Sequence, residues 1–344
     1  MNDIAILADV HFGYSNYEFL DSELRFFREV MIPELKRRGI KKIIQLGDLF
    51  ENRRHLDVYV MNKIHDLFEN DLKDFDIYIF FGNHDVFYKN SNEIHSFKFL
   101  KKFKNVTVIE TISELEVYNR KFLIVPWLYD LESFKKYIDD NDITEFDACF
   151  GHFDTIGSKM SKNSFSKNGL TKELLFKFKM VFSGHYHARS IEKREFGELI
   201  YVGMPYQLNR GDEGEDRGFC ILHCSDMSYE FVENNVSIKY VSLKYPETFE
   251  ESKIKGNIID IYISNNDDID QIQSYIDDLN KFGPAQEPTK HFIDDLNLAD
   301  TKDIKVKNVK DMFDEYIGQL NINEEIKDDV IEHINMLYEE SQKD

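Results

Sequence analysis

The sequence predicts an α/β protein whose main domain consists of two mixed β-sheets packed as a sandwich with flanking helices. Over about the first 230 residues, apolar runs of strand length alternate with helical patterns. Residues 106–127 instead show short strands separated by turns, which indicates a mixed or antiparallel sheet. The rest of the chain predicts a small α/β module and a C-terminal helical pair, and 344 residues are enough for all of these parts.

The main domain is expected to cover residues 1–230. Helices are expected near residues 17–38, 56–72, 93–103, 131–139 and 170–178, where apolar residues recur every three or four positions. Strands are expected at residues 4–8, 41–46, 76–81 and 106–127, near 149, 181 and 201, and at 218–223 and 229–232. The small α/β module follows at residues 231–281, with a strand at 258–263 and a helix at 269–279.

The C-terminal part has a different character. Residues 282–302 combine Gly283, Pro284 and Pro288 with scattered acids and no periodicity, which predicts a linker. Residues 303–344 contain two short amphipathic helical patterns that meet at a turn with a capping signal. These helices either pack back onto the main domain or dock into a groove of a partner, and docking is the favoured interpretation.

Composition indicates a globular protein without a signal peptide or a membrane span, because no apolar run approaches the roughly 18 residues that a span needs. The three cysteines are odd in number, which predicts reduced thiols in a cytoplasmic protein rather than a disulfide or zinc framework. The net charge of −21 argues at first against binding of nucleic acid, but residues 264–344 carry −13 of it. Residues 158–179 are basic, with six lysines against one glutamate.

The strongest signal is a set of strands that end in metal-ligand residues. Four apolar runs end in a glycine that is followed, directly or within the next few residues, by Asp, Asn or His, and an earlier strand delivers Asp9 and His11 without the glycine. The ligands that follow the glycines are Asp48, Asn83, His152, His185 and His187. Strands that end side by side can surround a pair of metal ions, and glycine lets the backbones approach closely. The sequence therefore predicts a two-metal catalytic site.

Asp48 is the natural bridging ligand, because a carboxylate can give one oxygen to each ion. The other ligands divide into two sets: Asp9, His11 and His187 for one ion, and Asn83, His152 and His185 for the other. Mixed His, Asp and Asn ligands suit manganese, iron or zinc better than magnesium. Such a pair of ions can activate water and stabilise charge on a phosphate under attack. His84, beside Asn83, would then donate a proton to the leaving oxygen or stabilise the transition state.

These motifs are recognisable as a set. Asp9-x-His11, Gly47-Asp48-x-x-Glu51, Gly82-Asn83-His84-Asp85, Gly151-His152 and Gly184-His185-x-His187 resemble the calcineurin-like metallophosphoesterase superfamily. Within it, the chain is most similar to the SbcD-type nuclease subunit of the SbcC–SbcD (Mre–Rad) DNA-repair complex, and above all to the recombination-endonuclease subunit of T-even-like phages. Residues 201–206 and 211–219 also look like that branch, and the resemblance covers essentially the whole chain.

The resemblance implies a Mn²⁺-dependent DNA nuclease of repair and recombination, with exonuclease action on duplex ends and endonuclease action on single strands. Two Mn²⁺ ions are implied, with Mg²⁺, Fe²⁺ or Zn²⁺ as other candidates. Residues 231–281 would be a DNA-capping domain, and residues 303–344 would bind the coiled coil of an SbcC/Rad-like ATPase subunit. The family also implies a homodimer, located in the host cytoplasm if the chain is phage-encoded. The chain has no phosphate-binding loop of its own, so any ATP dependence would come from the partner.

One residue departs from the cellular relatives, which often carry His three positions after the bridging Asp, where this chain has Glu51. We expect Glu51 to hydrogen-bond His84 and to favour its protonated form, which makes Glu51 a second candidate catalytic residue. Asp85 is expected to anchor its loop or to orient a neighbouring group.

Basic residues near the motifs are candidates for DNA contacts. The candidates are Arg53, Arg54, Lys159, Lys162 and Lys167. Contact with phosphate groups and a plain solvated surface are both open interpretations. Two rival functions remain: a small-molecule phosphomonoesterase or phosphodiesterase on the same scaffold, which needs neither the tail nor the basic stretch, and a scaffold protein with an architectural metal site, which would not need His84.

Overall fold

The computed structural model describes residues 2–14, 17–88, 91–127, 130–161, 164–264 and 267–293. The main domain contains two six-stranded sheets. The first has the order β16 (Ser228–Glu233), β15 (Gly218–His223), β1 (Asp3–Leu7), β2 (Lys42–Gln45), β3 (Asp76–Phe80) and β6 (Val106–Ile109). The second has the order β13 (Ser190–Lys193), β14 (Glu198–Tyr201), β12 (Met180–Gly184), β9 (Ala148–His152), β8 (Arg120–Val125) and β7 (Ser113–Val117).

The two sheets pack face to face, as β1 illustrates. Its side chains alternate, so that Ile4 and Ile6 join the core between the sheets while Ala5 and Leu7 join the core beneath the helices. Phe150 and Phe182 of the second sheet lie in the same inter-sheet core. Both faces of this strand are buried, which explains the apolar run from Ile4 to Leu7. The mixed two-sheet sandwich predicted from the sequence is confirmed.

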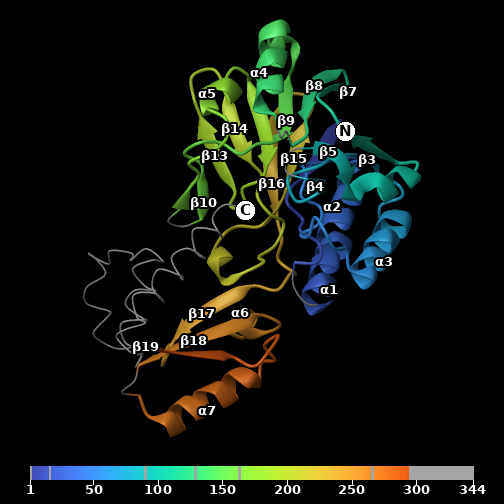
Figure 1. Cartoon of the computed structure of the whole chain (residues 1–344). Helices are drawn as coiled ribbons and strands as arrows, with labels where there is room; N and C mark the ends of the chain where they lie inside the picture. Colours follow the sequence, from blue (N-terminus) through green and yellow to red (C-terminus); the bar gives the residue numbers. More distant parts are fainter. Residues whose placement is uncertain are drawn as a thin grey trace, which may run out of the picture.

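Helices cover the outer faces of the sandwich (Figure 1). They are α1 (Tyr17–Arg25), α2 (Ile32–Arg38), α3 (Val58–Asp66), α4 (Leu131–Asp140) and α5 (Lys172–Leu175). A π-helical segment, Phe26–Met31, joins α1 to α2, and a second, Leu67–Asp71, extends α3. Asp57 caps α3 by accepting the N–H groups of Tyr59 and Val60. The helices predicted at residues 17–38 and 131–139 are confirmed, whereas the one predicted at 170–178 is only four residues long.

The helix predicted at residues 93–103 is wrong. The chain there forms a hairpin of β4 (Val86–Tyr88) and β5 (Ser91–His95), followed by a 3₁₀ helix, Ser96–Lys102. Phe97 and Leu100 are both buried in the 3₁₀ helix, and their spacing of three residues fits a 3₁₀ helix as well as an α-helix. A second short hairpin joins β10 (Lys159–Ser161) to β11 (Ser164–Phe165).

The small module forms a separate lobe below the sandwich in Figure 1. Its elements are β17 (Tyr240–Lys244), α6 (Glu251–Ile254), β18 (Ile258–Ser264), α7 (Ile269–Asn280) and β19 (Thr289–Ile293). The three strands are parallel, and Ile259, Ile261 and Ile263 of β18 pack against Ile272 and Ile276 of α7. This module has its own hydrophobic core.

The predicted boundaries of the module need two corrections. The linker expected at residues 282–302 is wrong over Thr289–Ile293, which forms the edge strand β19. This strand follows Pro288 and is only partly buried, so it lacks the apolar run that marks a buried strand. At the other end, β16 continues the sandwich to Glu233, beyond residue 230. The helices expected at 303–344 lie outside the described residues.

The two lobes meet through the turn that precedes β15. Arg210 Nε donates to Asp260 Oδ2 of β18 at 2.6 Å, and Glu213 accepts from the N–H and the hydroxyl of Ser242 at 2.5 and 2.6 Å. Phe19 of α1 packs with Ile258 in a small apolar cluster between the lobes. Within the described ranges, no helix has the length and apolar character that a membrane crossing requires.

Candidate metal centre

The predicted ligands meet at one edge of the sandwich. β1, β2 and β3 are parallel to one another, as are β9 and β12, so the carboxyl ends of neighbouring strands coincide. The ligands at these ends are Asp9 and His11 after β1, Asp48 after β2, Asn83 after β3, His152 at the end of β9, and His185 and His187 after β12. Residues that are up to about 180 positions apart in sequence therefore form a single polar cluster.

The backbone turns sharply at several ligand positions. Asp9, His11 and Asp48 have φ angles of 48°, 52° and 51°, and His185 has a φ angle of 91°. Residues with a Cβ rarely adopt this left-handed region, and each costs of order 1–3 kcal/mol unless the surroundings enforce it. Four strained residues among the seven predicted ligands indicate that the fold imposes the geometry of this cluster.

Glycine allows the ligand loops to touch. A Cβ on Gly47, which has a φ of +90°, would lie 2.5 Å from the backbone nitrogen of Gly82. A Cβ on Gly82 would overlap Asp48 Oδ1 and would lie 2.5 Å from His152 Cε1. Both positions exclude side chains, which bears out the close approach expected from the glycine motifs.

Asp48 lies between the two groups of ligands. Its Oδ2 atom is 3.3 Å from His152 Nε2 and 3.7 Å from His11 Nε2. On one side, Asn83 Oδ1 lies 3.0 Å from His152 Nε2 and 2.9 Å from His185 Nδ1. On the other side, the rings of His11 and His187 are 4.8 Å apart. Asp9 Oδ1 connects the two sides by accepting the backbone N–H of His185 at 2.8 Å.

The donor atoms fit metal ions. Asp9 Oδ2 and His11 Nε2 are buried and have no hydrogen-bond partner, which is costly unless something else binds them. His11 Nδ1 lies 2.6 Å from Glu51 Oε2, and His152 Nδ1 donates to the carbonyl of Leu46 at 2.8 Å. Hydrogen bonds of this kind fix an imidazole tautomer and leave Nε2 free to bind a metal.

The charges of the cluster also suit metal binding. Burial lowers the pKa of His185 to about 4 and the pKa of His187 to about 3, so both rings are neutral at pH 7, as ligation requires. Burial alone would raise the pKa of Asp48, but His152 and His11 outweigh it and hold that pKa well below its usual range. Asp48 is therefore ionised at neutral pH. Burial alone would lower the pKa of His152, but Asp48 and Asp9 outweigh it and raise that pKa to about 9, so a metal ion that binds His152 must displace a proton.

The prediction that the Glu51 carboxylate hydrogen-bonds His84 is wrong. Glu51 Oε2 lies 2.6 Å from His11 Nδ1 but 3.9 Å from His84 Nδ1. The His84 ring instead donates from Nδ1 to the backbone carbonyl of Glu51 at 2.6 Å. Both rings lie near Glu51, with centroids 4.9 Å apart, and the sequence alone does not decide which of them the carboxylate takes. The Glu51 carboxylate therefore orients His11, a predicted ligand, and only the Glu51 backbone orients His84.

Asp85 and two further residues complete the surroundings. Asp85 accepts the backbone N–H groups of Asp48 and Gly82 at 2.7 and 2.8 Å, so it anchors the loops as expected. Trp127, which follows β8, stacks on His185 with ring centroids 5.5 Å apart, and Asp154 Oδ1 lies 3.9 Å from His185 Nε2. Trp127 and Asp154 belong to none of the ligand motifs, so the sequence predicts no role for them in the cluster. Their signal was their position: Trp127 follows the strand beside β9, and Asp154 follows His152 by two residues.

The candidate DNA-contact residues are more dispersed. Arg54 and Lys167 are exposed, Arg53 is half-buried, and Lys159 lies on β10, while Lys162 falls outside the described residues. In the part of the chain that the structure describes, no hydrogen bond or ion pair joins Arg53, Arg54 or Lys167 to the ligands. Their contact with DNA stays a prediction.

The chain is similar to several known proteins. The chain is 26% identical over 317 residues to exonuclease subunit 1 of Enterobacteria phage T4, which covers 89% of each chain. It is 25% identical over 266 residues to the putative phosphoesterase 078R of Invertebrate iridescent virus 3, covering 75% of this chain and 72% of the relative. A solved archaeal phosphodiesterase is similar at 16% identity and a TM-score of 0.38, over 67% of this chain and 99% of that one.

The family model of the calcineurin-like phosphoesterases matches residues 3–189, which include every predicted metal ligand and His84. This segment is more than half of the chain, and its strands carry the ligand cluster described above. The resemblance read from the motifs is confirmed, and the chain belongs to the calcineurin-like phosphoesterase family.

Proposed function

We propose that this protein is a two-metal DNA phosphodiesterase, acting as an exonuclease on duplex ends and as an endonuclease on single strands. The observation that carries the proposal is the ligand cluster around Asp48, with His84 beside it. His84 Nδ1 donates to a backbone carbonyl, and the amide N–H of His84 donates to Asp48 Oδ1 at 2.8 Å. A histidine fixed from both sides at the edge of such a cluster suits proton transfer to a substrate.

We assign separate roles to the residues that would hold the metal ions, the residue that would donate a proton and the residue that anchors the loops. One ion would be held by Asp9, His11 and His187 and the other by Asn83, His152 and His185, with Asp48 between them. Two bound divalent ions, for which we propose Mn²⁺, would supply an activated water and positive charge against the phosphate oxygens. Because the carbonyl of Glu51 occupies Nδ1 of His84, Nε2 is the atom that can donate a proton to the leaving oxygen. Asp85 holds the loops in register.

The substrate class and the partner are proposed from the relatives. A relative that spans nearly the full length is named as a subunit of an exonuclease, which supports DNA as substrate and a complex with a second subunit. We place the chain as the nuclease subunit of an SbcC–SbcD-like repair and recombination complex. The helices expected at 303–344 would bind the coiled coil of the ATPase, the small module would cap DNA, and two copies would form a homodimer in the cytoplasm.

A comparison of substrates tests this function. The purified chain with Mn²⁺ is given end-labelled duplex DNA, the diester bis(p-nitrophenyl) phosphate and the monoester p-nitrophenyl phosphate. We expect hydrolysis of the diester and of DNA, and little hydrolysis of the monoester. The small-molecule phosphoesterase would be favoured instead if the monoester is hydrolysed faster than the diester and DNA is not degraded even when the ATPase subunit is present.

A further inference from the structure

Arg217 is a buried arginine that touches a predicted metal ligand. It directly precedes β15, and only 5% of its surface is exposed. Its Nη1 group donates to the backbone carbonyl of His187. Its Nη2 group donates to Asp212 Oδ1 at 2.8 Å and to Glu215 Oε2 at 2.7 Å. A buried guanidinium is stable only when it is paired in this way, so its position is fixed by the two carboxylates.

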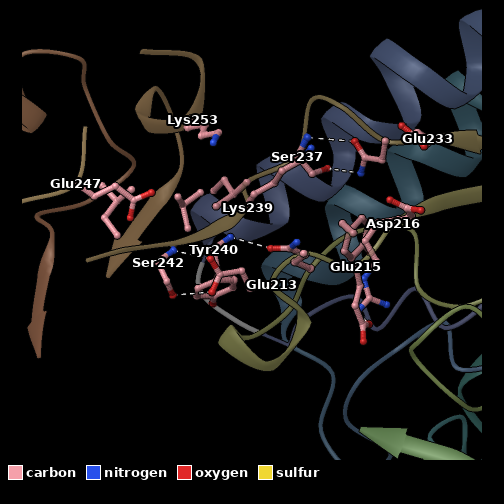
Figure 2. Close-up of a pocket in the computed structure, with 18 residues that line it drawn as sticks. Glu213, Glu215, Asp216, Glu233, Ser237, Lys239, Tyr240, Ser242, Glu247 and Lys253 are labelled. Carbon is pink, nitrogen blue, oxygen red and sulfur yellow. Dashed lines mark hydrogen bonds and ion pairs between the residues drawn. The ribbon is translucent and has the colours of Figure 1, made fainter. Parts of the chain in front are cut away.

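The carboxylates are held in turn by the loop that carries them. Asp212 Oδ2 accepts the backbone N–H groups of Leu208 and Asn209 at 2.9 and 3.0 Å. Glu213, in the same loop, binds Ser242 of the small module on the wall of the cleft shown in Figure 2. This cleft of about 400 Å³ is also lined by Arg217. The loop is therefore braced both internally and against the second lobe.

The carbonyl of His187 is held from a second direction as well. It accepts the N–H of Met204 at 3.0 Å. A Cβ on Gly203, which has a φ of +77°, would lie 2.9 Å from the same oxygen. Arg217 thus closes a set of contacts that fix the backbone of His187, whose ring lies against that of His11.

We propose that Arg217 is a positioning residue that holds the backbone of His187, so that its imidazole completes the ligand set with Asp9 and His11. This inference rests on the two-ion function proposed above. Residues around metal ligands typically contribute 10–100-fold to metal affinity. Loss of Arg217 should therefore weaken the ion held by His187 and leave the ion held by Asn83, His152 and His185 bound.

A matched arginine separates this role from ordinary stabilisation. Arg120 has the same kinds of partner: it donates to the carbonyls of Cys224 and Ser225 and to Asp147 Oδ1, at 2.7 to 3.0 Å. None of these partners is a predicted ligand. Arg120→Met thus removes a comparable set of hydrogen bonds without touching the metal centre.

The test is a Mn²⁺ titration of the metal-stripped full-length chain by calorimetry and electron paramagnetic resonance, without DNA. We expect wild type and Arg120→Met to bind two ions alike. We expect Arg217→Met to keep one ion at wild-type affinity and to bind the other on the order of 10–100-fold more weakly. Arg217→Lys, which restores the charge and one donor, should recover part of the loss.

Two results would overturn the proposal. One is Arg217→Met binding both ions as wild type does; the other is an equal loss at both sites, accompanied by the same fall in melting temperature as in Arg120→Met. If Arg217→Met does not fold, Glu215→Gln replaces it, because Glu215 is partly exposed and pairs with Arg217. A smaller loss confined to one ion supports the proposal, and unchanged binding overturns it. The titration contains no DNA. If the protein fails to degrade DNA in the substrate comparison described above, that result counts against the nuclease function and leaves the role of Arg217 unaffected.

Discussion

Asp85 shows how one carboxylate can organise two ligand loops. Its oxygens accept four backbone N–H groups, from Gly82 and from the three consecutive residues Asp48, Leu49 and Phe50. Because Asp85 is 1% exposed, water does not replace these bonds when the carboxylate is removed. The loops that carry Asp48 and Asn83 therefore depend on the backbone hydrogen bonds that Asp85 accepts.

We predict that Asp85→Ala lowers the free energy of unfolding by about 3 kcal/mol, because it leaves several buried donors unpaired. Urea denaturation measures the loss. The control is Asp142→Ala, since Asp142 is exposed and accepts only from Thr144, so that its removal should cost about 1 kcal/mol or less. Equal losses in the two variants would show that Asp85 is not an anchor.

We predict that Glu51→Gln weakens Mn²⁺ binding about tenfold, because a neutral amide orients and polarises His11 less well than a carboxylate does. The backbone carbonyl that holds His84 is unchanged in this variant. Mn²⁺ titration and the pH dependence of the rate should be measured together. Unchanged affinity with a shifted pH profile would instead support the Glu51–His84 pairing expected from the sequence.

The sequence could predict that the seven candidate ligands cluster, because each lies at the end of an apolar strand or within four residues of it. It could not predict the partner of Glu51, because two imidazoles lie within reach of one carboxylate and a choice between side chains leaves no trace in spacing. The hydrogen bond from Arg217 to His187 could not be predicted either, because it goes to the backbone carbonyl, which every residue has.

At the scale of elements, alternation and helical periodicity predicted the sandwich strands and the long helices because these elements bury whole faces. The errors fall on elements that bury little. β19 is a partly exposed edge strand, and the hairpin β4–β5 is short and only partly buried. Such elements are stabilised by pairing with a neighbouring strand, and a single sequence does not display that pairing.

We predict that Gly82→Ala abolishes binding of at least one metal ion, because the added methyl group would overlap Asp48 Oδ1 and approach His152. The control is Gly256→Ala in the small module, where nothing lies within 4 Å of the added Cβ. Because Gly256 has a positive φ, the control should lower the free energy of unfolding by about 1 kcal/mol, and it should bind metal as wild type does. Normal Mn²⁺ stoichiometry in Gly82→Ala would contradict the close approach of the loops.

At the scale of the whole molecule, the arrangement of the two lobes could not be predicted from the sequence. Arg210 and Asp260 are 50 residues apart, and no local pattern links them. Asp260 is 3% exposed at its side chain and also lies 2.7 Å from His291 Nε2, so this contact joins the sandwich to two strands of the module. The existence of the module followed from its strand and helix pattern, whereas its position follows from pairs of this kind.

A buried glutamate makes the stability of the main domain depend on pH. Glu23 of α1 is 2% exposed, neither of its carboxylate oxygens has a hydrogen-bond partner, and burial raises its pKa well above 4.5. The folded state therefore keeps a proton that the unfolded state releases, so stability falls as pH rises above about 4.5. The fall continues until the pH passes the pKa of the folded state.

We predict that Glu23→Gln removes this dependence. Over that pH range, the free energy of unfolding of the variant should rise relative to that of wild type by about 1.4 kcal/mol per pH unit. At pH 4 the two proteins should differ little. Melting temperatures measured between pH 4 and pH 9 check the prediction. Parallel curves for the two proteins would show that Glu23 does not titrate differently in the folded state.

The nuclease assignment is tested most directly by degradation of end-labelled duplex DNA in Mn²⁺, comparing wild type, His84→Gln and His55→Gln. His55 is an exposed histidine outside the metal centre, so its variant controls for the substitution itself. We expect wild type and His55→Gln to degrade DNA, and His84→Gln to lose on the order of 10²–10⁴ in rate while still binding two Mn²⁺ ions. Equal rates in all three proteins would contradict the role given to His84 and the catalytic site built around it.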